Sequence, residues 1–316
     1  MTVERKALCG VLSIDTRADG RHRLRGPEPI QAWPATRGGA VELSVLDLVA
    51  IAAVLAVAGL AMGFLVGLFG IGGGGIAAPV LYEVFSFLGV DPAIRMHLAL
   101  GTSLAVMIPT STRSFLAHRA RGGVDMDAWR RLAPGVVFGV VLGAVIASLS
   151  SGTALKWVWI AFSFSMAAKL WFGRDTWRLG DTLPPRPMVE LWGLITGTIS
   201  TLLSIGGGAL ITMLLTLYGR SIQTAVGTAA GVGPLIAIPG AIGFMWAGWG
   251  VPVPIPFTIG YVSLIGAAAL IPTGVLAAPW GVRVAHGISR RKLEIGFGLL
   301  LATMGARFLM SVIAGT

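Results

Sequence analysis

The chain has 316 residues, of which 55% are hydrophobic and only 12% are charged. An ordinary soluble domain carries about 25% charged residues, so this composition excludes a soluble globular protein. The formal net charge of +10 does not indicate a nucleic-acid partner, because the basic residues fall in short loops between apolar segments and form no basic stripe with interleaved aromatic side chains.

The first 44 residues differ in kind from the rest of the chain. They contain seven Lys or Arg and five Asp or Glu, with scattered Gly and Pro and no sustained hydrophobic periodicity. The apolar stretch 7–14 is interrupted by Gly10 and lacks an obvious small-residue cleavage site, so it is a poor signal peptide. Residues 1–44 are predicted to be a disordered N-terminal tail, or a segment that arises from a wrongly assigned start codon.

Ten apolar segments follow the tail, separated by charged residues or by Pro and Gly. They lie at about 45–69, 74–90, 95–118, 131–150, 154–173, 188–204, 207–219, 221–247, 255–282 and 291–313. A helix of about 20 apolar residues crosses the hydrocarbon core of a bilayer, and these segments do not alternate as transmembrane β-strands do. The chain is predicted to be an all-α polytopic membrane protein with about eight to ten membrane segments, because 188–204 and 207–219 are short for full crossings.

The two halves of the chain share a pattern. Gly70–Ile76 in the first half matches Ser204–Leu210 in the second. Downstream, Gly101-Thr102 is matched by Gly227-Thr228. Two matched landmarks in the same order favour a duplication, and internal repeats are common in secondary transporters. The predicted organisation is a first membrane repeat over 45–173, a hydrophilic connector over 174–187 and a second membrane repeat over 188–316.

Basic residues are concentrated in three connections between the segments, 119–131, 174–190 and 283–292, whereas the connection 248–256 carries no charge. The positive-inside bias places basic connections in the cytoplasm. Ten crossings with an outside N-terminus satisfy this bias and make the repeats inverted. Nine crossings with an inside N-terminus also satisfy it, with unequal halves. We favour the inverted repeats.

Each repeat carries a glycine cluster within its apolar part. The clusters comprise Gly72, Gly73, Gly74 and Gly75 in the first repeat and Gly206, Gly207 and Gly208 in the second. Each glycine lowers helix propensity by about 1 kcal/mol, so a cluster predicts a broken or re-entrant segment. The helix that restarts after such a break presents free amide groups and a positive dipole end to an anionic ligand. The alternative interpretation is that the glycines allow close packing of membrane helices.

Four further residues complete the predicted substrate-binding set: Thr102, Ser103, Thr228 and Arg113. Hydroxyl groups in membrane helices bind a ligand or satisfy a neighbouring helix backbone; the ligand role is favoured for Thr102, because it recurs as Thr228. The two roles remain equally open for Thr110–Thr112. Arg113 is an ionisable group in a predicted membrane segment, which indicates function, but its long side chain can equally reach the headgroups.

The sequence contains no signature of an enzyme and no predicted catalytic residue. The four histidines have no metal-ligand spacing, and the glycine clusters are not followed by the Gly-Lys-Ser/Thr of a phosphate loop. The single cysteine, Cys9, excludes an internal disulfide and a cysteine metal cage. We predict neither a cofactor nor a metal.

Several stretches together resemble a known family. Gly67–Tyr82 (GLFGIGGGGIAAPVLY) and Gly101–Trp129 (GTSLAVMIPTSTRSFLAHRARGGVDMDAW) resemble the first signature of the sulfite exporter TauE/SafE family. Ser204–Leu210 (SIGGGAL) and Ala225–Gly250 (AVGTAAGVGPLIAIPGAIGFMWAGWG) fit its second signature. The resemblance covers about residues 45–313.

The resemblance implies a multi-pass permease of the inner (cell) membrane that exports or imports sulfite, sulfonates or similar small anions. Two departures limit what it implies about the substrate. Met213 stands in the second repeat where the first has Pro79, and Ala105-Val106 replaces an Asn-Gln pair found in some members.

The predicted function is a secondary transporter for a small anion, with proton or ion coupling and with the lipid bilayer as its surroundings. The oligomeric state is left open. The competing prediction is an anion channel or a membrane assembly factor without coupled transport. Concentrative uptake that depends on a proton gradient separates the transporter from both.

Overall fold

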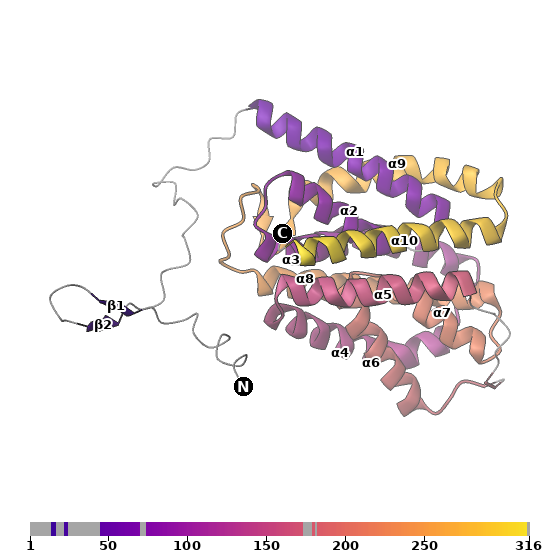
Figure 1. Cartoon of the computed structure of the whole chain (residues 1–316). Helices are drawn as coiled ribbons and strands as arrows, with labels where there is room; N and C mark the ends of the chain where they lie inside the picture. The colour runs from indigo at the N-terminus through magenta and orange to yellow at the C-terminus, as the bar shows by residue number, and fades with distance from the viewer. Residues whose placement is uncertain are drawn as a thin grey trace. The chain divides into compact units, whose positions relative to one another are not determined.

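The structure is a computed structural model, in which the chain divides into two compact units, Met1–Leu48 and Val49–Thr316 (Figure 1). It describes residues 14–16, 22–24, 45–69, 74–172, 179–180 and 182–314. In the first unit, β1 (Ile14–Thr16) pairs with β2 (His22–Leu24) in an antiparallel hairpin. The sequence patterns do not predict this hairpin. The rest of the predicted disordered tail lies outside the described residues.

Ten helices make up almost all of the described part of the second unit, and the first of them begins at the end of the first unit. They are α1 (Val45–Phe69), α2 (Gly74–Phe87), α3 (Pro92–Ala120), α4 (Met126–Leu149), α5 (Gly152–Phe172), α6 (Arg186–Leu203), α7 (Gly208–Leu217), α8 (Ile222–Ala247), α9 (Leu264–His286) and α10 (Arg290–Ile313). Each of the ten predicted apolar segments corresponds to one helix. The segment predicted at 255–282 begins too early, because a short hairpin of β3 (Thr258–Ile259) and β4 (Val262–Ser263) precedes α9.

Polar side chains in the connections set several helix starts. Asp91 accepts a hydrogen bond from the Ala93 amide (2.8 Å) at the start of α3, and Asp125 accepts one from the Ala128 amide (3.0 Å) at the start of α4. Ser221 does the same for α8. Such caps satisfy backbone N–H groups that have no partner within the helix, so these helices begin at the connections.

Five of the described helices are long and apolar enough to cross a membrane: α3, α4, α8, the Leu264–Gly281 part of α9 and the Arg291–Ile313 part of α10. Large apolar side chains such as Phe138, Leu276 and Leu299 are exposed on their outer faces. A water-soluble protein rarely exposes apolar surface on this scale. Lipid is the solvent that suits these faces.

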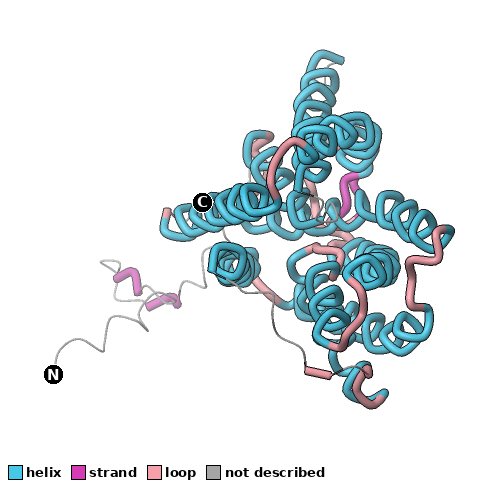
Figure 2. Tube along the Cα trace, turned by 90° about the vertical axis from the view of Figure 1, so that its right-hand side faces the viewer, coloured by secondary structure: helices cyan, strands magenta, loops and turns pink. Residues whose placement is uncertain are grey.

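Helices α3 and α8 pack against each other in opposite directions along most of their length. A Cβ added at Gly101 would lie 2.9 Å from the Phe244 Cβ, whereas one added at Gly231 would lie 2.8 Å from the Phe115 ring. Early residues of α3 therefore contact late residues of α8, and the reverse. Figure 2 looks down several of the helices and shows that they pack mainly against one another.

Glycines allow two parallel helix pairs to approach backbone to backbone. A Cβ at Gly139 of α4 would lie 2.1 Å from the Leu194 carbonyl oxygen of α6, and one at Gly197 of α6 would lie 2.3 Å from the Val136 carbonyl oxygen. In the same way, a Cβ at Gly63 of α1 would lie 2.2 Å from the Gly274 carbonyl oxygen of α9. Small residues allow this close packing of membrane helices.

The three basic connections lie at one end of this helical body. Asp125, after α3, forms a 2.9 Å ion pair with Arg220, after α7. The Leu179 amide, after α5, donates to the Leu217 carbonyl at the end of α7. Arg291, at the start of α10, donates to the Leu170 carbonyl at the end of α5. All three basic connections thus lie at the same end of the helical body. The predicted topology, which puts them on one side of the membrane, requires this.

The uncharged connection lies at the opposite end. Tyr261, from the β3–β4 turn, stacks on His97 near the start of α3, with ring centroids 5.0 Å apart. The His97 Nε2 lies 3.1 Å from the carbonyl oxygens of Ala147 and Ser150, at the end of α4. The starts of α3 and α5 and the hairpin before α9 thus lie together.

Candidate substrate site

The second glycine cluster breaks the chain between α6 and α7. Helix α6 ends at Leu203; the next residue, Ser204, has a φ of 53°, and Gly207 has a φ of 67°. The Ile205 amide donates to the Ser200 carbonyl (2.9 Å) and closes the end of α6. A serine with positive φ is uncommon, and such strained positions often occur at functional sites.

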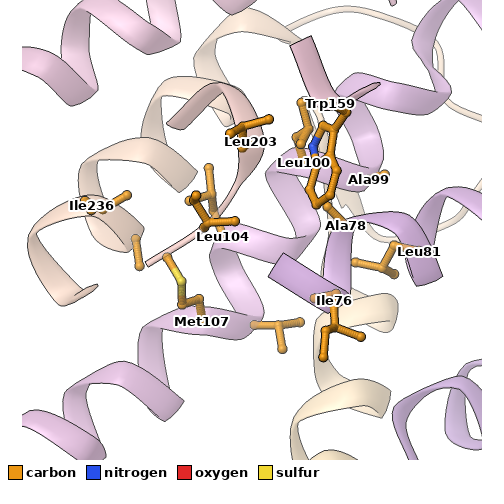
Figure 3. Close-up of a cluster of buried hydrophobic side chains, with 14 of the residues drawn as sticks. Ile76, Ala78, Leu81, Ala99, Leu100, Leu104, Met107, Trp159, Leu203 and Ile236 are labelled. Carbon is orange, nitrogen blue, oxygen red and sulfur yellow. The ribbon is translucent and has the colours of Figure 1, made fainter. Parts of the chain in front are cut away.

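This break lies against the middle of the crossing of α3 and α8. A Cβ at Gly206 would lie 3.4 Å from the Met107 sulfur of α3, and one at Gly207 would lie 2.9 Å from Ile236 Cδ1 of α8. Figure 3 shows Met107 and Ile236 in one buried cluster with Leu203 of α6. Because Gly207 has no side chain, the turn can lie this close to the Ile236 side chain of α8.

The start of α2 lies beside the same turn between α6 and α7. A Cβ at Gly75 would lie 3.4 Å from Ile205 Cγ2, and Ile76 belongs to the same buried cluster (Figure 3). Gly74 is the first residue of α2. Gly72 and Gly73 lie outside the described residues. The helices that follow the two glycine clusters therefore both begin beside the Ser204–Gly207 turn.

Two buried serine hydroxyls flank this turn, and sequence reasoning missed both. Ser200 and Ser204 are fully buried, and neither hydroxyl has a hydrogen-bond partner among the described residues. The Ser200 Oγ lies 3.4 Å from the position of a Cβ on Gly207. A buried hydroxyl without a partner is rare and calls for an explanation. The signal was the position of Ser204 as the first residue of the stretch Ser204–Leu210, which matches Gly70–Ile76.

The chemistry of the turn suits an anion. The first amide groups of a helix have no carbonyl partner inside the helix, and α7 starts at Gly208 directly after the turn. These amides, with the hydroxyls of Ser200 and Ser204, are hydrogen-bond donors in a region enclosed by Met107 and Ile236. Donors of this kind at a helix N-terminus bind anionic groups.

Thr102 and Thr228 lie apart from the turn and from each other. The Thr102 Oγ1 accepts a hydrogen bond from the Ser263 amide (3.0 Å), just before α9, and the Thr228 Oγ1 accepts one from the Asp125 amide (2.8 Å), just before α4. Gly227 packs against His118, 16 residues along α3 from Thr102, which corresponds to about 24 Å at 1.5 Å per residue. The two threonines are too far apart to bind one small ligand.

The glycine before each of these threonines explains why the Gly-Thr dipeptide occurs in both halves. A Cβ at Gly101 would lie 2.2 Å from the Tyr261 carbonyl oxygen, and one at Gly227 would lie 2.0 Å from the Gly123 carbonyl oxygen. Each Gly-Thr pair therefore holds the backbone that leads into a helix of the other half. Thr102 and Thr228 thus each accept a hydrogen bond from a backbone amide of the other half.

The two other predicted residues are not brought to the turn by any described contact. Ser103 is fully buried beside Thr102. Arg113 is exposed, six residues beyond Met107 on α3. No group of three or more His, Cys, Asp or Glu side chains in the described part of the chain is arranged to hold a metal ion.

The profile of the family described as sulfite exporter TauE/SafE matches residues 55–308. This match covers most of the chain. The chain belongs to the sulfite exporter TauE/SafE family. It is a multi-pass membrane protein of a transporter family and not an enzyme. The matched residues include the break between α6 and α7 and the crossing of α3 and α8.

Relatives from distant organisms carry similar descriptions. A probable membrane transporter protein of Haemophilus influenzae is 31% identical over 241 residues, which cover 76% of this chain and 90% of the relative. A probable membrane transporter protein of Methanocaldococcus jannaschii is 28% identical over 257 residues, covering 81% and 94%. No solved structure gave a significant match.

Proposed function

We propose that this family member is a secondary transporter that carries a small anion, such as sulfite, a sulfonate or a related sulfur-containing organic anion, across the cell (inner) membrane. The observation that carries the proposal is the pair of buried hydroxyls without described partners, Ser200 and Ser204, at the open start of α7. The name of the family supports sulfur oxyanions as the substrate class.

The anion binds at the Ser204–Gly207 turn, in contact with Ser200, Ser204, Gly75 and the amides after Gly207. Helix α7 has ten residues and is therefore about 15 Å long, half of a hydrocarbon core of about 30 Å. Since Leu217, at its end, returns to the end of the body where α6 begins, α6 and α7 form a re-entrant hairpin. Half-helices that end at the midplane form the substrate sites of many transporters.

Paired contacts support inverted repeats. Thr102 holds the residue before α9, and Thr228 holds the residue before α4. The parallel glycine contact of α4 with α6 is matched by that of α1 with α9. These two contacts of one repeat thus each have a counterpart in the other. The basic end faces the cytoplasm in this arrangement.

Transport requires that the site opens to each side in turn. Ser200 and Ser204 are 0% exposed, so an anion can reach them only after the surrounding helices move. Helices α4 and α6, and helices α1 and α9, contact each other through glycines that have no side chains to interlock. At these contacts the helices of each pair can slide past each other. Movement there exposes the Ser204–Gly207 turn to one side of the membrane at a time.

A competition experiment tests the proposal. Proteoliposomes that contain the purified protein should take up radiolabelled sulfite faster than empty liposomes, and an excess of unlabelled taurine, sulfoacetate or sulfate should reveal which anions compete. Carboxylates of similar size serve as the comparison. Uptake equal to that of empty liposomes, measured in turn with radiolabelled sulfite, taurine, sulfoacetate and sulfate, would contradict the proposed substrate class.

A further inference from the structure

Helix α5 carries two buried hydrogen-bond donors that have no partner among the described residues, the Trp159 indole nitrogen and the Ser163 hydroxyl. Both residues are 0% exposed. They are four residues apart and therefore lie on one face of the helix. A buried polar group that makes no hydrogen bond costs free energy, so each such group in a native structure calls for an explanation.

Trp159 lies at the depth of Leu100 of α3. A Cβ added at Gly152, the first residue of α5, would lie 3.1 Å from the Ala93 carbonyl oxygen at the start of α3. Both helices run from this end of the body toward the basic end. Trp159 comes seven residues after Gly152, and Leu100 comes seven residues after Ala93, so an equal rise per residue brings them to one level.

The end of α6 lies at this level too. Leu203, the residue before the Ser204–Gly207 turn, belongs to the same buried cluster as Leu100 and Trp159. Figure 3 shows these three side chains together, with the nitrogen of Trp159 on the edge of the ring that faces Leu203. Helix α5 contacts both α3 and α6. The Trp159 N–H is therefore directed toward the end of α6, where Ser204 follows.

Ser163 lies one turn further along α5, close to the depth of the turn itself. By the same count of residues, Ser163 is level with Leu104 of α3. Met107, which contacts the turn at Gly206, is three residues beyond Leu104, or about 4.5 Å along the helix axis. Gly305 of α10 packs on the Ser163 Cβ and covers it from outside. Both donors of α5 thus lie inside the body, near the proposed transport site.

No unpaired carboxylate is described near these donors. Helices α3, α5, α7 and α8 contain no Asp or Glu. Glu190 of α6 pairs with Arg186 (2.8 Å), and Glu83 of α2 pairs with Arg307 (2.8 Å). An anion at this depth therefore meets hydrogen-bond donors and no free negative charge that would repel it.

We propose that the anion-binding site at the Ser204–Gly207 turn extends onto α5, where the Trp159 N–H and the Ser163 hydroxyl donate hydrogen bonds to oxygens of the bound anion. The inference rests on the proposed function and adds two residues that determine affinity for the anion. Two buried donors of α6, Ser200 and Ser204, and two of α5 then bind the same ligand. An indole N–H can only donate, so it suits an oxygen that carries negative charge and no proton.

Ligand-induced thermal stabilisation of the purified full chain in detergent tests this assignment, because a ligand that binds only the native state raises its stability. Sodium sulfite is titrated against sodium chloride at equal ionic strength. The shift of each variant is measured from its own ligand-free melting temperature, so a change in intrinsic stability does not enter the comparison.

Trp159→Phe keeps an aromatic ring beside Phe162 and Phe308 and removes the N–H. It should weaken sulfite binding at least tenfold, because a hydrogen bond to a charged group is stronger than one between neutral groups. Trp157→Phe is the matched control, since Trp157 is 50% exposed on the same helix, and it should bind like wild type. Wild-type affinity in Trp159→Phe would overturn the inference.

Ser163→Ala decides the outcome if Trp159→Phe does not fold, because alanine keeps the Cβ that packs on Gly305 and removes only the hydroxyl. It should weaken binding at least threefold, whereas Ser165→Ala, at an exposed position of α5, should not. Wild-type affinity in Ser163→Ala would then overturn the inference.

Gly207→Leu separates this inference from the proposed function. If Gly207→Leu loses sulfite binding while the α5 variants keep it, the turn binds the anion without α5, and only the inference fails. If sulfite, sulfoacetate and sulfate all leave the melting temperature of the wild-type protein unchanged, the proposed function and the inference fail together.

Discussion

Replacing Gly139 with leucine is expected to prevent the protein from folding. A Cβ at this position would lie 2.1 Å from the Leu194 carbonyl oxygen and 2.9 Å from the Thr198 nitrogen, both of them backbone atoms of α6. A backbone cannot rotate away as a flexible side chain can, so the two helices must separate along their whole contact. Overpacking costs about 1–3 kcal/mol even where side chains can adjust, and here the cost should exceed that range.

The measurement is the yield of monodisperse protein after membrane extraction and size-exclusion chromatography. Gly139→Leu should give less than a tenth of the wild-type yield. Val141→Leu is the matched control, because Val141 lies two residues along α4 on the exposed face, and it should behave like wild type. A wild-type yield from Gly139→Leu would show that α4 and α6 do not pack backbone to backbone.

Replacing Gly207 with leucine should abolish transport and leave most of the protein folded. Gly207 has a φ of 67°, which costs a side-chain-bearing residue about 1–2 kcal/mol. The nearest atoms to its added Cβ are the side-chain ends Ile236 Cδ1 (2.9 Å) and Thr196 Cγ2 (3.1 Å), and such atoms can move. The leucine side chain would then fill the space beside the Ser200 hydroxyl and exclude the anion.

The matched control for this variant is a substitution of the next residue, Gly208. Gly208 offers the anion only its backbone amide, which alanine keeps, and nothing lies within 4 Å of an added Cβ, so Gly208→Ala should keep both yield and flux near wild type. Gly207→Leu should reduce anion flux at least a hundredfold with at least half the wild-type yield. If flux and yield fell in parallel, the role of Gly207 would be helix packing alone.

The sequence predicts the helices well, because membrane helices are specified locally. A run of about 20 apolar residues is long and apolar enough to cross the bilayer as a helix. Charged or glycine-rich connections mark where each run ends. All ten segments were found in this way. The exceptions are the two short hairpins, β1–β2 and β3–β4, which contain only two or three residues in each strand and give too weak a pattern to detect.

The site was predictable only in part, because its contacts join residues far apart in the sequence. The glycine cluster at 206–208 predicted a break, and the chain does break there. Nothing near Thr102 indicates that its partner is the Ser263 amide, which is 161 residues away. Ser200 has no distinctive neighbours in the sequence, and only the turn of the chain after Ser204 brings it to the break.

Glycines in the described helices and turns have different surroundings. At Gly139, Gly197 and Gly63 an added Cβ would collide with backbone atoms of a neighbouring helix, so these glycines serve packing. At Gly207 the backbone requires a positive φ, and at Gly208 there is free space. The two roles separate only when the neighbours are known, because composition and spacing are similar in both cases.

Substrate counterflow in proteoliposomes tests the central claim most directly. Vesicles loaded with unlabelled sulfite and diluted into labelled sulfite should accumulate the label transiently above its external concentration, because a carrier with a site that alternates between the two sides exchanges one anion for another. Gly208→Ala should show this overshoot and Gly207→Leu should not. Labelled anion that only equilibrates, with no overshoot in wild type, would indicate a channel and would contradict the account.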